Sequence, residues 1–296
     1  MRVFVTGATG FVGSAIVKEL IGAGHKVLGL ARSETNAAKL TEAGAEVHLG
    51  DLNDLESLRA GAEASDGVIH AGFIHDWANM AASCETDRLA IETLGAALAG
   101  SERPLIVTAG MAMVSPGRIA TEDTIAVHIP GGLPRLSEVA ALRLLDDGGR
   151  VAVMRLPPTV HGDGDHGFVP MLIGIARQKG ASAYIGEGLN VWPAVHRFDA
   201  ARLYRLVLEK ALIGRFHPIA EQGVPFKDIA GAIGRGLKLS VVSKTPEEAA
   251  EHFGWFARFA GIDCPGSSAQ TRQRTGWAPT QVELIADLDN GSYFGT

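Results

Sequence analysis

Three glycines directly after an N-terminal apolar strand constrain the fold most. Residues 2–5 read as a strand, and Gly7, Gly10 and Gly13 follow it before the amphipathic segment 11–21. In such a strand–turn–helix unit, Gly7 allows a tight turn, Gly10 lets a pyrophosphate approach the backbone, and Gly13 lets the helix pack closely on the sheet. The helix N-terminus would then attract the phosphates through its free N–H groups and its dipole. The spacing therefore predicts a dinucleotide site, with a purely structural glycine turn as the alternative.

Apolar strand-like segments alternate with amphipathic helical segments through the first half of the chain. The predicted strands are 2–5, 26–30, 46–49, 67–70, 104–108 and 150–155. The predicted helices lie near 11–23, 34–43, 54–62, 85–99 and 135–146. This alternation predicts an α/β fold, a Rossmann-type doubly wound parallel sheet whose ligands bind beyond the carboxyl ends of the strands.

The alternation ends near residue 156, where loops rich in Gly and His begin. We predict that residues 1–160 and about 191–215 form the dinucleotide-binding Rossmann domain. Residues from about 161 to 190 and from 216 to 296 are predicted to form a smaller substrate-binding lobe. A chain of 296 residues is long enough for a large core of this kind with an added lobe.

Composition and net charge indicate which kinds of binding partner the protein can have. Hydrophobic residues make up 46% of the chain and the net charge is −6, which favours a globular protein without a nucleic-acid or anionic-membrane partner. Cys84 and Cys264 lie far apart and are expected to be buried free thiols. Residues 1–13 already form a domain motif rather than a signal peptide, and no apolar stretch approaches the roughly 20 residues of a membrane span. We expect a cytoplasmic protein with a small-molecule substrate.

The segment Thr6-Gly-Ala-Thr-Gly-Phe-Val-Gly13 resembles the glycine motif of the extended short-chain dehydrogenase/reductases, the group that contains NAD-dependent epimerases and dehydratases. Further matching segments follow in the same order: Asp51-Leu52, His70-Ala71-Gly72, Met154-Arg-Leu-Pro-Pro-Thr-Val-His-Gly162 and Val195-His-Arg-Phe-Asp199. The resemblance covers roughly residues 1–215 and implies an NAD(P) site. Related proteins often form homodimers through helices packed on the sheet; apolar stripes near 85–99 and 135–146 could form such an interface, and the alternative is that they face the core. The nucleotide contacts that it implies are Gly7, Thr9, Gly10, Phe11, Val12, Gly13, Asp51, Leu52, Ala71, Gly72, Thr108 and Pro157.

The end of the second predicted strand indicates which nucleotide binds. NAD-preferring sites usually place Asp or Glu here to hold the ribose 2′-hydroxyl. This chain has Arg32 and Ser33 instead, and a guanidinium would attract a 2′-phosphate. We therefore predict NADP over NAD, although Glu34 is close by and a solvated surface role for Arg32 is the alternative.

The acid/base pair that the resemblance implies is missing. Enzymes of this group use the Tyr of a Tyr-x-x-x-Lys unit, in which the Lys lowers the pKa of the Tyr. Residues 109–149 contain neither Tyr nor Lys. When the segments are aligned on Ser137, Pro134 takes the Tyr position and Glu138 takes the Lys position. Thr108, just before the position of the usual Ser or Thr that orients the substrate oxygen, is one catalytic candidate.

His161 is the other catalytic candidate, because it follows the proline segment and an unperturbed His titrates near about 6.5. A structural His bonded to the backbone is the alternative. Asp163, Asp165 and His166 follow in the same loop, but adjacent loop residues rarely converge on one ion, so we expect no metal. The sequence predicts an atypical NADP-binding oxidoreductase or epimerase-like enzyme of unknown substrate. A non-catalytic NADP(H)-binding sensor or scaffold is the alternative.

Overall fold

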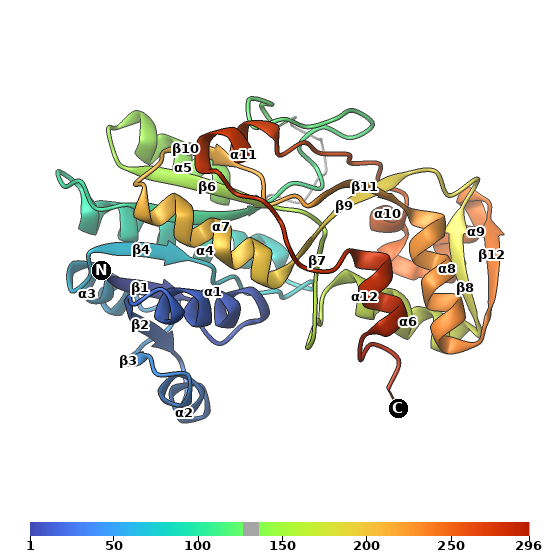
Figure 1. Ribbon diagram of the computed structural model, residues 1–296, viewed down its shortest axis with the longest axis horizontal. Helices are drawn as coiled ribbons and strands as arrows, with labels where there is room; N and C mark the ends of the chain where they lie inside the picture. The colour runs from blue at the N-terminus through green and yellow to red at the C-terminus, as the bar shows by residue number, and fades with distance from the viewer. Residues whose placement is uncertain (127–135, 296) are drawn as a thin grey trace.

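A seven-stranded parallel sheet forms the middle layer of the part of the molecule at the left of Figure 1. The computed structural model describes residues 1–126 and 136–295. Across the sheet the strands are β10 (Gly214–Phe216), β6 (Val151–Leu156), β5 (Leu105–Gly110), β4 (Gly67–His70), β1 (Arg2–Thr6), β2 (Lys26–Ala31) and β3 (Glu46–Leu49). The predicted α/β fold is confirmed, and each of the six predicted strands is present to within about two residues at either end.

Helices cover both faces of this sheet because its strands are apolar on both sides. One face, where Val3 and Val5 point, is covered by α1 (Phe11–Gly22), α2 (Glu34–Glu42) and α7 (Arg197–Glu209). The opposite face, where Phe4 points, is covered by α3 (Leu55–Glu63), α4 (Met80–Leu98) and α5 (Ser137–Asp146). Residue 135, where the predicted helix 135–146 was expected to begin, lies outside the described residues.

A second lobe follows β6 and lies at the right of Figure 1. One of its small sheets contains β11 (Glu221–Pro225), β9 (Val191–His196) and β7 (Thr159–His161), and the other contains β12 (Ser240–Lys244) and β8 (Ala181–Ile185). Its helices are α6 (Phe168–Lys179), α8 (Phe226–Leu237), α9 (Pro246–Phe253), η1 (Gly254–Phe256), α10 (Ala257–Ala260) and α12 (Leu284–Asn290). Trp192, Phe226 and Phe256 are fully buried at its centre, so the lobe has a hydrophobic core of its own.

Part of the C-terminal segment returns to the first sheet. Strand β10 extends that sheet, and α11 (Ala269–Thr275) packs on α7. Trp277 is buried in the same core, and its Nε1 donates to the carbonyl oxygen of Asp199 at 2.9 Å. The predicted division into two domains stays an interpretation, with β10, α11 and Trp277 placed against the nucleotide-binding half.

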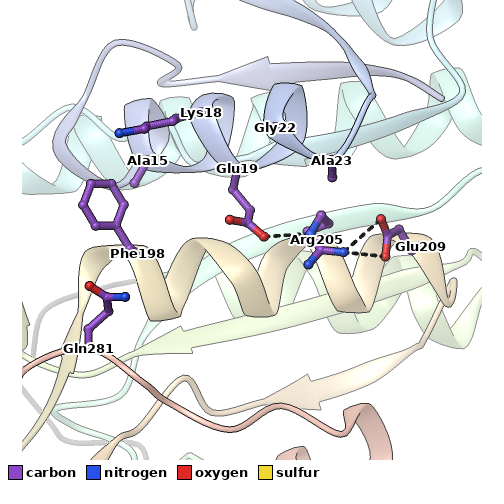
Figure 2. Close-up of a pocket in the computed structure, with 9 residues that line it drawn as sticks. All are labelled: Ala15, Lys18, Glu19, Gly22, Ala23, Phe198, Arg205, Glu209 and Gln281. Atoms are coloured by element: carbon purple, nitrogen blue, oxygen red, sulfur yellow. Dashed lines mark hydrogen bonds and ion pairs between the residues drawn. The ribbon is translucent and has the colours of Figure 1, made fainter.

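An open groove of about 700 Å³ lies on the outer face between α1 and α7 (Figure 2). Arg205 crosses it and bonds Glu19 at 2.7 Å and Glu209 at 3.0 Å. These charges therefore satisfy one another within the protein, and the groove does not include the glycine turn. Among the residues that the structure describes, no helix is both long and apolar enough to cross a membrane.

Candidate functional site

The turn between β1 and α1 has the backbone geometry that the glycines predict. Gly7 has φ +65°, and a Cβ there would lie 2.6 Å from the carbonyl oxygen of Ala71. A Cβ on Gly13 would lie 1.9 Å from the carbonyl oxygen of Gly7, so only glycine allows this approach of the helix. A Cβ on Gly10 would meet the Gly7 oxygen at 3.1 Å and otherwise open space. Among the residues that the structure describes, no side chain caps the first turn of α1, which leaves its N–H groups available to an anion.

A cavity of about 560 Å³ opens above this turn, beyond the carboxyl ends of β1, β4, β5 and β6. Its size is typical of small-molecule sites. It brings together nine of the predicted nucleotide residues: Gly7, Gly10, Phe11, Val12, Gly13, Ala71, Gly72, Thr108 and Pro157. Segments far apart in the sequence therefore meet in one place, as expected for ligands beyond the strand ends of a parallel sheet.

The remaining predicted nucleotide residues, Thr9 among them, do not line this cavity. Ala31 of β2 pairs with Leu49 of β3, so Arg32 and Asp51 follow neighbouring strand ends. The Arg32 side chain is exposed, whereas the Ser33 hydroxyl accepts from the backbone N–H of Asn36 at 3.3 Å and caps α2. Asp51 accepts from the backbone N–H of Asn53 at 2.9 Å. Leu52 lies close to the cavity, since a Cβ on Gly72 would be 3.3 Å from its Cδ2.

A buried polar chain fixes the strand ends beside the glycine turn. The His70 ring bonds Thr6 Oγ1 through Nδ1 at 2.8 Å and Asp87 Oδ1 through Nε2 at 3.1 Å. Ser137 donates to the other Asp87 oxygen at 2.5 Å, and the N–H of Gly72 donates to Thr6 Oγ1 at 3.2 Å. Because Thr6 accepts from Gly72, its own proton is free to be donated to His70 Nδ1. The chain therefore holds Gly72 in position at the cavity wall.

Thr108 is the polar group that the end of β5 presents to the cavity. Its Oγ1 lies 2.7 Å from the hydroxyl of Tyr204, a fully buried side chain on α7. Burial raises the pKa of Tyr204 well above its ordinary value. Tyr204 therefore acts as a neutral hydrogen-bonding partner that orients the Thr108 hydroxyl.

His161 does not line the cavity, although the preceding residue, Val160, does. Its ring is fully buried, and Nδ1 is 2.9 Å from Asp287 Oδ2 on α12. The ring edge meets His196 with the centroids 5.3 Å apart. Within the part of the chain that the structure describes, Nε2 has no hydrogen-bond partner. The predicted catalytic role of His161 stays a hypothesis, and its partner is a carboxylate rather than the backbone.

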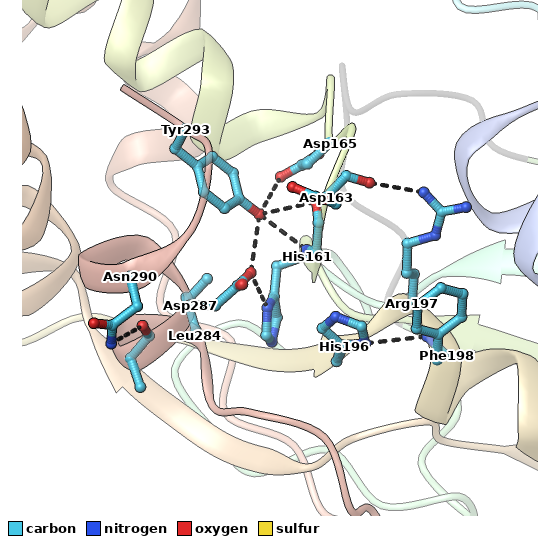
Figure 3. Close-up of polar contacts among 12 residues, drawn as sticks. His161, Asp163, Asp165, His196, Arg197, Phe198, Leu284, Asp287, Asn290 and Tyr293 are labelled. Carbon is cyan, nitrogen blue, oxygen red and sulfur yellow. Dashed lines mark hydrogen bonds and ion pairs between the residues drawn. The ribbon is translucent and has the colours of Figure 1, made fainter. Parts of the chain in front are cut away.

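Tyr293 connects this buried pair to the loop on the cavity wall (Figure 3). Its hydroxyl accepts from the N–H of Gly162 at 2.9 Å and lies 3.3 Å from Asp287 Oδ2 and 3.5 Å from Asp165 Oδ2. Burial opposes ionisation of Asp287, but the hydrogen bond from His161 holds its pKa below the ordinary value. The hydroxyl of Tyr293 therefore has three acceptors within 3.5 Å, the two carboxylates and the carbonyl oxygen of Gly162.

Asp165 is the carboxylate that lines the cavity. Its Oδ1 accepts from the backbone N–H of Gly167 at 2.7 Å. Burial raises its pKa from 3.8 to about 6. Among the described residues no three His, Cys, Asp or Glu side chains come close enough together to hold a metal ion. Burial therefore makes Asp165 easier to protonate than an ordinary carboxyl group.

Comparison with known proteins places the chain in a family. The model of the NAD dependent epimerase/dehydratase family matches residues 3–92. An uncharacterized protein of Schizosaccharomyces pombe is 51% identical over 297 residues, which cover 99% of this chain and 100% of that protein. An uncharacterized protein of Saccharomyces cerevisiae is 46% identical over 291 residues, which cover 97% and 98%. The chain belongs to the NAD-dependent epimerase/dehydratase family.

A solved structure from Streptomyces venezuelae shares the fold of this family member. It is DesIV, a dTDP-glucose 4,6-dehydratase with NAD and TYD bound. The TM-score is 0.76 at 19% identity, with 98% of this chain and 95% of that chain covered. The predicted family resemblance is confirmed, and the chain carries the family's NAD(P)-binding fold.

In the present chain, Glu138 is aligned with the usual Lys and is part of a buried cluster of charged side chains. Glu138 accepts from Arg155 Nε at 2.8 Å and from Arg215 Nε at 2.8 Å. Burial opposes ionisation of Glu138, but these guanidinium groups hold its pKa below the ordinary value. Arg155 is fully buried, so the pair is structural. Pro134, aligned with the usual Tyr, lies outside the described residues.

Sequence reasoning missed the partners that orient the candidates, Tyr204 for Thr108 and Asp287 for His161. They lie 96 and 126 residues away along the chain. Both lie in amphipathic helical segments. The signal available in the sequence was a polar side chain at a position on the core-facing side of the helix. The sequence alone suggests a role for Asp165 only as a possible metal ligand.

Proposed function

We propose that this protein is an NADP-dependent oxidoreductase that acts on a carbonyl or carbinol carbon. The observation that supports it best is the single cavity that joins the glycine turn to Thr108 and Pro157. In this family fold, such a cavity accommodates the nucleotide and the reacting carbon together. An epimerase-like reaction would use the same nucleotide without net redox change.

The residues at the glycine turn fit a dinucleotide. Gly7 and Gly13 leave no room for a Cβ, and the uncapped first turn of α1 offers N–H groups to a pyrophosphate. Arg32, exposed at the end of β2, would bind the 2′-phosphate of NADP, and Asp51 with Leu52 would border the adenine. When bound, the nucleotide supplies or accepts a hydride.

Two groups on the cavity wall take over the work of the missing Tyr and Lys. Thr108 Oγ1, held by Tyr204, donates a hydrogen bond to the substrate oxygen. Asp165 retains its proton up to about pH 6 because burial raises its pKa to about 6, so it can hold the proton that this oxygen needs. The Asp287–Tyr293 pair positions Asp165, with His161 behind it.

The test is titration of the purified protein with NADPH and NADH, followed by nucleotide fluorescence and by thermal stability. We expect tighter binding of NADPH, and Arg32→Asp should weaken it by roughly 10- to 100-fold, since a charge-assisted hydrogen bond to phosphate is replaced by repulsion. NADH binding should change little. Arg59→Asp on exposed α3 is the matched control, with no expected change in the NADPH-to-NADH ratio.

Two outcomes would contradict the proposal. Equal affinity for both nucleotides, unchanged in Arg32→Asp, would overturn the preference for NADP. Failure of both nucleotides to bind at millimolar concentration would overturn the oxidoreductase itself. The loss of the Tyr/Lys pair favours a second candidate, a non-catalytic NADP(H) sensor. Nucleotide binding without turnover of any carbonyl compound would support that sensor.

A homodimer through α4 and α5 belongs to the same proposal. Leu89 of α4 and Val139 of α5 are apolar side chains that are 37% and 46% exposed. Burial of such side chains against a second copy would favour a symmetric pair. Light scattering of the purified chain measures the mass directly, and a monomer at micromolar concentration would contradict the dimer.

A further inference from the structure

The wall of the cavity toward the second lobe is apolar and aromatic. It is built by the segment after β4, the segment after β5, and helices α6 and α10. Its side chains include Trp77, Met80, Met111, Phe168, Met171 and Phe259. Aromatic rings offer flat faces for stacking, and methionines adapt to irregular apolar shapes. This half of the cavity therefore suits a ligand with an extended apolar body.

The described residues that line the cavity offer few charges to an anionic substrate. They include no Lys and no Arg, the one carboxylate is Asp165, and His75 and His166 are the side chains among them that could carry a positive charge. A diphosphate placed in this half would meet no permanent cation among these residues and would be desolvated at high cost. The helix N-terminus that can hold a pyrophosphate is at the other side of the cavity, where the glycine turn holds the nucleotide. The substrate half therefore fits an uncharged compound.

Trp77 is the centre of the apolar wall. Its ring lies 5.7 Å from that of Phe259 at 72°, and 6.3 Å from that of Phe168. It also contacts the ring of Trp255 at 4.9 Å, and Trp255 is 57% exposed. Trp255 therefore joins this ring cluster to the surface of the protein. A ligand against Trp77 would change the fluorescence of both indoles.

We propose that the substrate is an uncharged aromatic or long-chain ketone or aldehyde, bound against Trp77, rather than a nucleotide sugar. This inference rests on the proposed oxidoreductase function. In the reducing direction, the carbonyl carbon receives a hydride from NADPH and the carbonyl oxygen receives a proton. The products are an alcohol and NADP⁺, so electrons and atoms balance.

The experiment compares three probes with the full-length protein: 4-phenyl-2-butanone, the anionic 4-oxo-4-phenylbutanoate, and UDP-glucose. Binding is followed by quenching of tryptophan fluorescence and by thermal stability, with and without NADPH, and turnover by NADPH absorbance. We expect the neutral ketone to bind best. Trp77→Ala should weaken its binding by roughly tenfold, whereas Trp77→Phe keeps an aromatic ring and most of the affinity. Because both variants lack the Trp77 indole, their binding is measured by thermal stability at increasing ketone concentration. NADPH affinity, unchanged in both variants, shows that they are folded.

Each other outcome has a defined meaning. Binding of UDP-glucose as tight as that of the ketone, or ketone binding that is unchanged in Trp77→Ala, would overturn the inference. The same holds if no neutral ketone binds while NADPH does. Ketone binding without any NADPH binding would support the apolar site and overturn the proposed oxidoreductase, so the two failures are distinguishable.

Discussion

Replacing Asp165 by Asn tests the buried carboxylate of the cavity. Because burial raises its pKa from 3.8 to about 6, the wild-type protein loses stability as the pH rises through this range. At about 1.4 kcal/mol per pH unit, this loss has an upper bound of about 3 kcal/mol. Asn carries no charge, so the Asp165→Asn variant does not lose stability in this way as the pH rises. We expect Asp165→Asn to be more stable than wild type by about 1–2 kcal/mol at pH 8, less than this bound because the Asp165 side chain is partly exposed and solvent screens its charge.

The pH dependence of this difference identifies its cause. Below about pH 4 both side chains are neutral, so the difference in the free energy of unfolding should be near zero. The difference in the free energy of unfolding should increase between about pH 4 and pH 6 and stay constant above pH 6. Urea unfolding at pH values from 3 to 8, followed by tryptophan fluorescence, measures it. Asp163→Asn, at an exposed position of the same loop, is the control, and its stability difference from wild type should show no such increase with pH. A difference that is constant with pH, or a variant less stable than wild type at pH 8, would refute the reasoning.

Two further substitutions test the geometry. Gly13→Ala should abolish NADPH binding at micromolar concentration, because its Cβ would lie 1.9 Å from the Gly7 carbonyl oxygen and displace the start of α1; wild-type affinity in a fluorescence titration would contradict this. Glu138→Ala should lower the free energy of unfolding by about 3–5 kcal/mol, since it leaves the buried guanidinium of Arg155 without its carboxylate. Urea denaturation checks it, with Glu92→Ala on the outer face of α4 as a control that should change stability by less than about 0.5 kcal/mol.

The features that the sequence predicted well are local ones. A buried parallel strand needs a short continuous apolar run, and a glycine turn needs Gly at fixed spacing, so both can be seen within a dozen residues. The six strands and the residues at the cavity wall from Gly7 to Gly13 were predicted for this reason. The absence of Tyr and Lys from residues 109–149 was equally visible.

The environment of the candidates could not be predicted in the same way. Whether Thr108 faces Tyr204, or His161 faces Asp287, depends on how helices from distant parts of the chain pack. The alternation of strands and helices predicts layers but not the rotation of α7 or α12 about its axis. The raised pKa of Asp165 likewise arises from burial by neighbours that sequence spacing does not specify.

The contact of Tyr293 with Gly162 and Asp165 has a consequence for biosynthesis. Strands β1 to β6 precede the second lobe along the chain, whereas Tyr293 lies 128 residues after Asp165. The loop that carries Asp165 therefore acquires its hydrogen bonds to Tyr293 only after that lobe has been translated. A nascent chain can form six of the seven strands of the parallel sheet before this wall of the cavity is held in place.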